Sequence, residues 1–289
     1  MTGGPTLVTG AAGKTGLAVI RALAHRDEPV RALVRTPEQE GRVVAAGARE
    51  ATSGDLRDRR TRDRVVAGVR AVYLICPNMS PDEEALAGGV IAACRGAGVE
   101  RLVYHSVLHP QIEAMPHHWA KMRVEETLFT SGLAWTILQP AAYMQNLLAG
   151  WSSIVDEGRY RVPYAAETRL GMVDLLDVAE VAAKVLGEDG HEGAIYELAG
   201  AEVLTQTEIA ARLTEAVGRP VTLEVAERSE WRRETLAAGL PEPAVETLLA
   251  MFRYYEEHGF WGNPRVLQHL LGRAPTPLAT FLKRSLADR

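Results

Sequence analysis

Apolar and polar positions follow two distinct rhythms along the first half of the chain. Short β-rich runs lie at 6–9, 30–34, 71–76, 102–105 and 134–138, and we expect one more short strand at 50–52. Between these runs, apolar residues recur every three or four positions, which predicts helices over 16–24, 37–46, 57–66, 83–95 and 117–129. Strands that are apolar nearly throughout and alternate with helices indicate a parallel sheet covered on both faces. Because such crossovers are right-handed, the pattern predicts an α/β fold with a doubly wound sheet.

The second half of the chain loses this alternation. We expect a helix over 145–156, an irregular stretch over 157–169, a helix over 177–186 and a strand over 194–198 that returns to the main sheet. Thr205 and Glu208 have the spacing of a capping box, so a helix should run from 205 to 217, followed by a strand over 219–225. Residues 229–286 read as mostly helical, with breaks at 239–243, 262–264 and 272–277. We therefore divide the chain into a sheet domain, residues 1–150, and a smaller, mostly helical lobe, residues 151–289.

Composition and charge then exclude several classes of protein. The chain has 289 residues, of which 47% are hydrophobic, and a formal net charge of −5, which argues against general attraction to nucleic acid or anionic lipid. Its two cysteines, Cys76 and Cys94, make no disulfide framework. We find neither the roughly 18 apolar residues of a membrane helix nor, in residues 1–8, a signal peptide. We expect a cytoplasmic protein with no nucleic-acid or membrane partner, and the sequence leaves a homodimer open.

A glycine-rich loop follows the first predicted strand. Gly10, Gly13 and Gly16 are spaced by three between an apolar strand and a helix. The first glycine permits a tight turn, the second lets the backbone approach a pyrophosphate, and the third lets the helix pack on the strand. The start of the helix then offers N–H groups and a partial positive charge to the phosphates. This context predicts a Rossmann-type dinucleotide site in the first domain.

The end of the second strand indicates which dinucleotide binds. An NAD site normally carries an acid there, whereas this strand ends in Arg35. Arg35 can grip a 2′-phosphate, and Lys14 can lend a second positive charge, so we expect NADP(H). Asp55, after the third strand, can accept a hydrogen bond from the adenine amino group, although a turn-forming role fits it nearly as well.

At these residues the sequence resembles the NmrA-like branch of the atypical short-chain dehydrogenases/reductases. The resemblance rests on the segments 9–16, 34–37, 53–56, 133–140, 172–179 and 271–277. It implies an NADP(H)-binding Rossmann domain with a smaller, mostly helical substrate lobe over the nicotinamide. The family contains reductases of quinones and enones and also non-catalytic redox sensors. The loop, the strand ends and the resemblance together predict cofactor contacts at Thr9, Gly10, Ala12, Gly13, Lys14, Thr15, Gly16, Arg35, Asp55, Leu56, Cys76, Pro77, Ser106, Lys121 and Pro140.

The catalytic residues depart from the pattern of ordinary members. These use a Tyr as proton donor and a Lys four residues later, which binds the nicotinamide ribose, beside a Ser after the fifth strand. The Lys matches Lys121 and the Ser falls near Ser106, but the Tyr position holds His117. His117 and Lys121 share a helix face, and an imidazole titrates near neutrality. We therefore take Lys121 and His117 as the candidate catalytic residues, with a histidine or water as the source of the proton.

Four of the eight histidines lie between positions 105 and 118. Three interpretations stay open: a substrate site including His105, His109 and His118, a metal site, or a polar surface loop. No His-Glu-x-x-His signature supports a metal. Tyr143 and Asn146, after the sixth strand, add a hydroxyl and an amide that a substrate could meet. The main hypothesis is an NADPH-dependent oxidoreductase that reduces a small, largely apolar carbonyl, enone or quinone. The alternative is an NADP(H)-binding redox sensor that acts through a protein partner.

Overall fold

The computed structural model describes residues 4–289, and the first three residues of the segment examined for a signal peptide lie outside this range. The chain forms two compact units. The first comprises Met1–Gln111, His117–Gln139 and Val178–Tyr196, and the second comprises Ile112–Pro116, Pro140–Asp177 and Glu197–Arg289. Within the described residues, no helix combines the length and the apolar character needed to cross a bilayer.

A seven-stranded sheet forms the centre of the first unit. Its strands are β1 (Thr6–Val8), β2 (Val30–Val34), β3 (Glu50–Ser53), β4 (Ala71–Leu74), β5 (Arg101–His105), β6 (Trp135–Pro140) and β10 (Ala194–Leu198). They lie in the order β10-β6-β5-β4-β1-β2-β3, and all pairs from β3 to β6 are parallel. This order confirms the predicted doubly wound sheet, and β10 returns to this sheet as expected, where it lies beside β6. The order reverses between β1 and β4, which is where sheets of this kind bind ligands.

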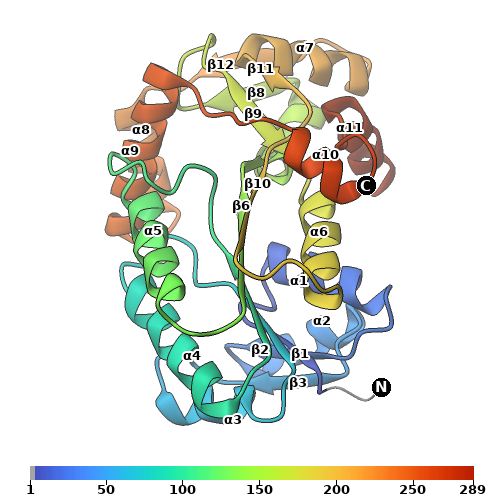
Figure 1. Ribbon diagram of the computed structural model, residues 1–289. Coiled ribbons are helices and arrows are strands. Elements are labelled where there is room, and N and C mark those ends of the chain that lie inside the picture. The colour runs from blue at the N-terminus through green and yellow to red at the C-terminus, as the bar shows by residue number, and fades with distance from the viewer. Residues whose placement is uncertain (1–3) are drawn as a thin grey trace. The chain divides into compact units, whose positions relative to one another are not determined.

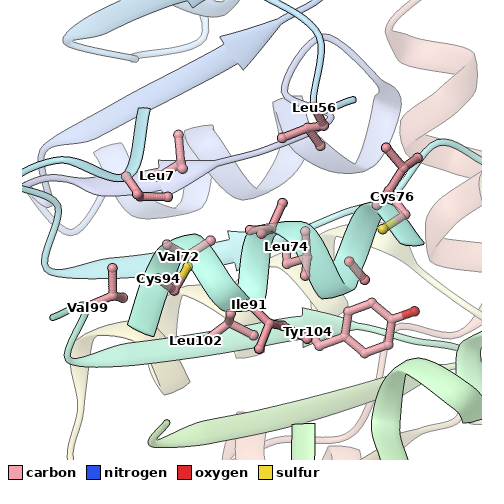
Figure 2. Packing of buried hydrophobic residues seen from close by; sticks show 14 of the residues in the cluster. Leu7, Leu56, Val72, Leu74, Cys76, Ile91, Cys94, Val99, Leu102 and Tyr104 are labelled. Atoms are coloured by element: carbon pink, nitrogen blue, oxygen red, sulfur yellow. The ribbon is translucent and has the colours of Figure 1, made fainter. Parts of the chain in front are cut away.

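Helices cover both faces of this sheet (Figure 1). One face carries α1 (Lys14–Ala24), α2 (Glu40–Ala45) and α6 (Leu175–Gly187), and the other carries α3 (Arg59–Val66), α4 (Glu83–Ala97) and α5 (Pro116–Phe129). The helix expected over 37–46 is split into a 3-10 turn, η1 (Pro37–Gln39), and α2. Figure 2 shows α4 lying along β4 and β5, with Cys94 beside Val72 and Ile91 beside Leu102 and Tyr104. Burial of these apolar side chains holds the helix layer on the sheet.

The second unit contains two small sheets and most of the C-terminal helices. The strands are β7 (Ala142–Tyr143), β9 (Leu170–Val173) and β11 (Val203–Leu204) in one sheet, and β8 (Arg159–Val162) and β12 (Thr222–Val225) in the other. The helices are η2 (Met144–Gly150), η3 (Ser153–Glu157), α7 (Gln206–Val217), α8 (Arg228–Ala237), α9 (Glu242–His258), α10 (Arg265–Leu271) and α11 (Leu278–Ala287). The predicted C-terminal helices and the Thr205–Glu208 capping box are confirmed.

Two expectations for this unit were wrong. The stretch 157–169 is not irregular throughout, because β8 lies inside it and pairs in parallel with β12, more than 50 residues away along the chain. The segment 145–156 does not form one α-helix, since it contains a 3-10 turn, η2, and a π-helical turn, η3. In both places a distant partner or a local change of hydrogen-bond spacing decides the structure, and periodicity detects neither.

Buried carboxylates fasten the C-terminal segment to the start of α6. Asp177 accepts hydrogen bonds from Arg273, from the backbone N–H of Thr276 at 2.7 Å and from the Thr276 hydroxyl at 2.9 Å. Asp174 accepts from Arg284 at 2.6 Å and from Gln145 at 2.7 Å. These contacts give the segment 172–179 a structural role within the second unit.

Candidate active site

The glycine-rich loop connects β1 to α1. Two of its glycines are required, one by its backbone conformation and the other by close contacts with backbone atoms. Gly10 has φ of +57°, a conformation that side chains with a Cβ rarely adopt. A Cβ on Gly16 would lie 2.6 Å from the carbonyl oxygen of Gly10 and 2.6 Å from Cα of Ala11. The loop is also tied to the end of β4, because the Thr9 hydroxyl donates to the Ile75 carbonyl and accepts from the Ile75 N–H. The predicted cofactor residue Thr9 therefore shapes the loop from inside the protein.

The first turn of α1 suits an anionic group. Its N-cap, Gly13, provides no side-chain cap, and no acidic residue lies in the first turn. The loop backbone therefore leaves a helix start at the switch point of the sheet, where N–H groups and the helix dipole favour a phosphate. Gly13 and Lys14 are exposed, and Ala12 and Thr15 are half-buried. The residues present thus fit the pyrophosphate of a dinucleotide.

Arg35 lies directly after β2 and its side chain is exposed. Its backbone N–H donates to Oε1 of Gln39 at 2.9 Å, which anchors the turn that carries it. Asp55, after β3, accepts the backbone N–H of Arg57 at 2.8 Å and forms an ion pair with the same residue. This is the turn-forming role considered for Asp55, and its contact with an adenine remains a prediction.

Lys121 projects from α5 into a set of buried polar groups. Its Nζ lies 2.6 Å from Oε1 of Glu83, and it also donates to the backbone carbonyl of His105 at 3.4 Å. The Tyr104 hydroxyl donates to the same Glu83 oxygen at 2.9 Å. Glu83 is 1% exposed, so this carboxylate is held inside the protein by a cation and a phenol.

Ser106 is engaged by a second buried carboxylate. Its hydroxyl donates to Glu125, which also accepts from Nε2 of Gln139 at 2.9 and 3.0 Å. Burial raises the pKa of Glu125, while the hydrogen bonds from Ser106 and Gln139 partly oppose the rise. Ser106 is itself buried, so its hydroxyl serves this network in the structure.

The four clustered histidines are buried or half-buried and are not exposed on a surface loop. His105 is hydrogen-bonded through Nδ1 to the Tyr73 hydroxyl at 2.6 Å, and Nδ1 of His118 lies 3.1 Å from the carbonyl oxygen of His109. His117 is half-buried, and within residues 4–289 its Nδ1 has no hydrogen-bond partner. Burial lowers the pKa of His105 and of His117 to about 3 and that of His118 to about 4.

These pKa values alter the expectation for His117. An acid with a pKa of about 3 is almost wholly deprotonated at neutral pH, so the imidazolium we expected as proton donor is not present there. The reason is desolvation, which disfavours the charged ring, together with the nearby Lys121 charge. Burial thus decides the protonation state of His117, and its place in a catalytic site stays a prediction.

The remaining predicted residues divide between the two units. Leu56 and Cys76 are buried in the first unit and Pro77 is half-buried there, while burial and the Glu83 carboxylate raise the pKa of the Cys76 thiol to about 12. Such a thiol is unreactive. Pro140, Tyr143 and Asn146 belong to the second unit, and their contacts with cofactor or substrate remain predictions.

The sequence analysis missed both buried carboxylates. Glu83 was read only as the start of a helix, and nothing in its local sequence distinguishes it from an exposed helix-start acid. Glu125 had a usable signal, because it follows His117 and Lys121 at the i, i+4, i+8 spacing of one helix face.

Comparison with known proteins gives a consistent result. The model of the NmrA-like family matches residues 5–282. The NAD(P)H azoreductase of Xenophilus azovorans is 30% identical over 286 residues, which cover 97% of this chain and 98% of that protein. The quinone oxidoreductase QOR2 of Escherichia coli, solved with NADPH, has a TM-score of 0.84 and 27% identity over 97% of this chain and 99% of its own. The triphenylmethane reductase of Citrobacter sp., solved with NADP(H), has a TM-score of 0.84 and 26% identity over the same shares of the two chains.

Proposed function

The chain belongs to the NmrA-like family, and from its loop, strand ends and half-buried Lys121 we propose that it reduces small, largely apolar quinones with NADPH. The coarser statement is that it is an NADP(H)-dependent oxidoreductase, because full-length relatives are NAD(P)H-dependent reductases and similar structures hold NADPH or NADP(H). The choice of quinones is the finer proposal. It is supported by the relative from Escherichia coli named as a quinone oxidoreductase, which matches over 94% of this chain.

The observation that carries the proposal is the uncapped start of α1 at the switch point of the sheet. There the loop from Gly10 to Gly16 would hold the pyrophosphate through backbone N–H groups. Arg35, exposed after β2, would bind the 2′-phosphate, and Lys121 would donate to the nicotinamide ribose. Bound NADPH supplies the hydride. Since His117 is neutral at pH 7, we propose that water supplies the proton that the reduced quinone takes up.

The test follows NADPH oxidation by its absorbance with a panel of quinones, enones and an azo dye, using NADH as the competing donor. We expect turnover with quinones and a preference for NADPH that Arg35→Ala reduces by about 1.5–3 kcal/mol, the range for hydrogen bonds to charged groups. Arg49→Ala is the matched control, because Arg49 is also exposed but lies just before β3. It is therefore at the amino ends of the parallel strands, away from the carboxyl ends where Arg35 lies. Equal use of NADPH and NADH by the unaltered protein would contradict the assignment of Arg35.

One outcome would favour the alternative function. If the protein binds NADPH tightly but oxidises it with no member of the panel, the redox-sensor hypothesis becomes the better one. The observation behind that hypothesis is the absence of a tyrosine at position 117, where the resemblance expects the proton donor.

A further inference from the structure

The contact between Lys121 and Glu83 joins two elements that are far apart in sequence. Glu83 is the first residue of α4 and Lys121 lies on α5, 38 positions later. A carboxylate is favoured at a helix N-terminus by the helix dipole, yet a residue only 1% exposed also needs a close counter-charge. The Lys121 ammonium at 2.6 Å provides that charge.

The same contacts restrict the ammonium. Lysine has a long, flexible side chain, and holding it in one conformation costs about 2 kcal/mol in lost rotamer entropy. Here Nζ contacts Oε1 of Glu83 and the carbonyl oxygen of His105, and it lies 5.5 Å from the centre of the Tyr104 ring. Tyr104 is packed in the apolar cluster of α4, β4 and β5 (Figure 2), and its hydroxyl fixes the Glu83 oxygen. Through these contacts, Lys121 is held at the carboxyl end of β5.

An ammonium group has three N–H donors. Two of them face Glu83 and the His105 carbonyl, and residues 4–289 offer the third no further acceptor. That third donor lies at the sheet edge where α/β folds bind their ligands. A ribose hydroxyl is a suitable acceptor for it.

The buried thiol, phenol and imidazole groups around Lys121 are uncharged at neutral pH. Burial raises the pKa of Cys76 to about 12 and that of Tyr104 well above 10, so both are neutral. The pKa values of His105 and His117 are about 3 and that of His118 is about 4, so these rings are neutral as well. Glu125, on the next turn of α5, has a raised pKa and is bound by Ser106 and Gln139. The negative charge in direct contact with the ammonium is therefore that of Glu83.

We propose that Glu83 is a positioning residue for the cofactor: its carboxylate, fixed by Tyr104, keeps Lys121 charged and directed toward the nicotinamide ribose. This inference rests on the proposed function, which assigns the ribose contact to Lys121. Glu83 itself touches neither the cofactor nor the reacting atoms in this proposal. It acts only through the ammonium.

The experiment measures NADPH affinity by calorimetry between pH 6 and pH 9, with circular dichroism as a check on folding. Glu83→Gln keeps the size and a hydrogen-bond acceptor for Tyr104 but removes the charge. Without that charge the buried ammonium loses its proton more readily, so NADPH should bind about tenfold more weakly at pH 9, and less so at pH 6. Glu84→Gln, the same change at the exposed neighbouring residue, should leave the affinity and its pH dependence unaltered.

A double-mutant cycle separates positioning from a general structural effect. Lys121→Ala alone should weaken NADPH binding, and adding Glu83→Gln to it should weaken binding no further, because the two residues act as one unit. If Glu83→Gln does not fold, Glu83→Asp keeps the charge but withdraws it by one methylene, and we expect about tenfold weaker binding with little pH dependence.

The outcomes are distinguishable. If Lys121→Ala weakens binding while Glu83→Gln matches Glu84→Gln, the inference is overturned and the proposed function stands. The inference is also overturned if Glu83→Gln is equally harmful with and without Lys121, since it then acts by another route. If Lys121→Ala leaves NADPH binding unchanged, the ribose assignment and the inference fail together.

Discussion

Replacing Gly16 by alanine tests whether the loop geometry is what holds the cofactor. The added Cβ would lie 2.6 Å from Cα of Ala11, 2.7 Å from the Ala11 carbonyl oxygen and 2.6 Å from the Gly10 carbonyl oxygen. Carbon atoms normally approach to about 3.5–4.0 Å, so the loop backbone would have to move by roughly 1 Å. All three contacts are with backbone atoms, which cannot yield by a change of rotamer. The strain therefore falls on the segment that would hold the pyrophosphate.

A second glycine provides the control for helix propensity. Gly88 lies inside α4, and a Cβ there would meet nothing within 4 Å. Gly88→Ala should stabilise the protein by about 0.5–1 kcal/mol, because alanine loses less backbone entropy in a helix. Gly16→Ala gains a similar amount but also incurs overpacking, which typically costs about 1–3 kcal/mol. The difference between the two variants in the free energy of unfolding isolates that strain.

The assay combines urea unfolding with calorimetric titration of NADPH. We expect Gly16→Ala to be less stable than Gly88→Ala by about 1–3 kcal/mol and to bind NADPH at least about tenfold more weakly, a loss of about 1.4 kcal/mol. Gly88→Ala should bind NADPH like the unaltered protein. The reasoning is refuted if both variants gain stability equally and neither loses affinity.

Two further predictions concern the histidines. If water supplies the proton, His117→Phe should turn over quinones at a rate within a few-fold of the unaltered protein. A loss of turnover on the order of 10²–10⁴ would instead show that His117 is the acid. The folded-state pKa values of about 3, 3 and 4 for His105, His117 and His118 lie below the unfolded value of 6.5, so the unfolded chain binds more protons between these limits. Their contribution to stability should be complete above about pH 6.5 and decrease as the pH falls toward 4, by at most about 1.4 kcal/mol per pH unit for each histidine. Urea unfolding at several pH values gives the free energy of unfolding as a function of pH. Its slope against pH should be smaller for His117→Gln than for the unaltered protein, and unchanged for His25→Gln, at an exposed position. Equal slopes in the two variants would contradict the burial of the His117 ring as the cause.

Sequence reasoning worked best where one local feature suffices. The strand and helix periods of the first half predicted the strands from β1 to β6. The inner strands are apolar nearly throughout because they are buried on both faces, whereas the edge strand β3 is partly exposed. The glycine spacing predicted the loop, since Gly10 and Gly16 are needed for a positive φ and for a close backbone contact. The capping box at Thr205 was equally local.

It failed where a distant residue or burial decides the outcome. The pairing of β8 with β12 depends on two short segments far apart in sequence, and neither alone has enough pattern to be recognised. The placement of Glu83 beside Lys121 and Tyr104 likewise exists only once α4, β5 and α5 pack together.

The sequence by itself determined the doubly wound sheet, the glycine-rich loop and the type of cofactor, because each is encoded by residue types at short, fixed spacings. Only the tertiary structure decided the charge states at the site. A histidine four residues before a lysine suggests an acid, but the pKa of His117 depends on how much water the folded chain removes from it. Whether a helix-start glutamate is exposed or is a buried counter-ion depends in the same way on the elements that pack over it.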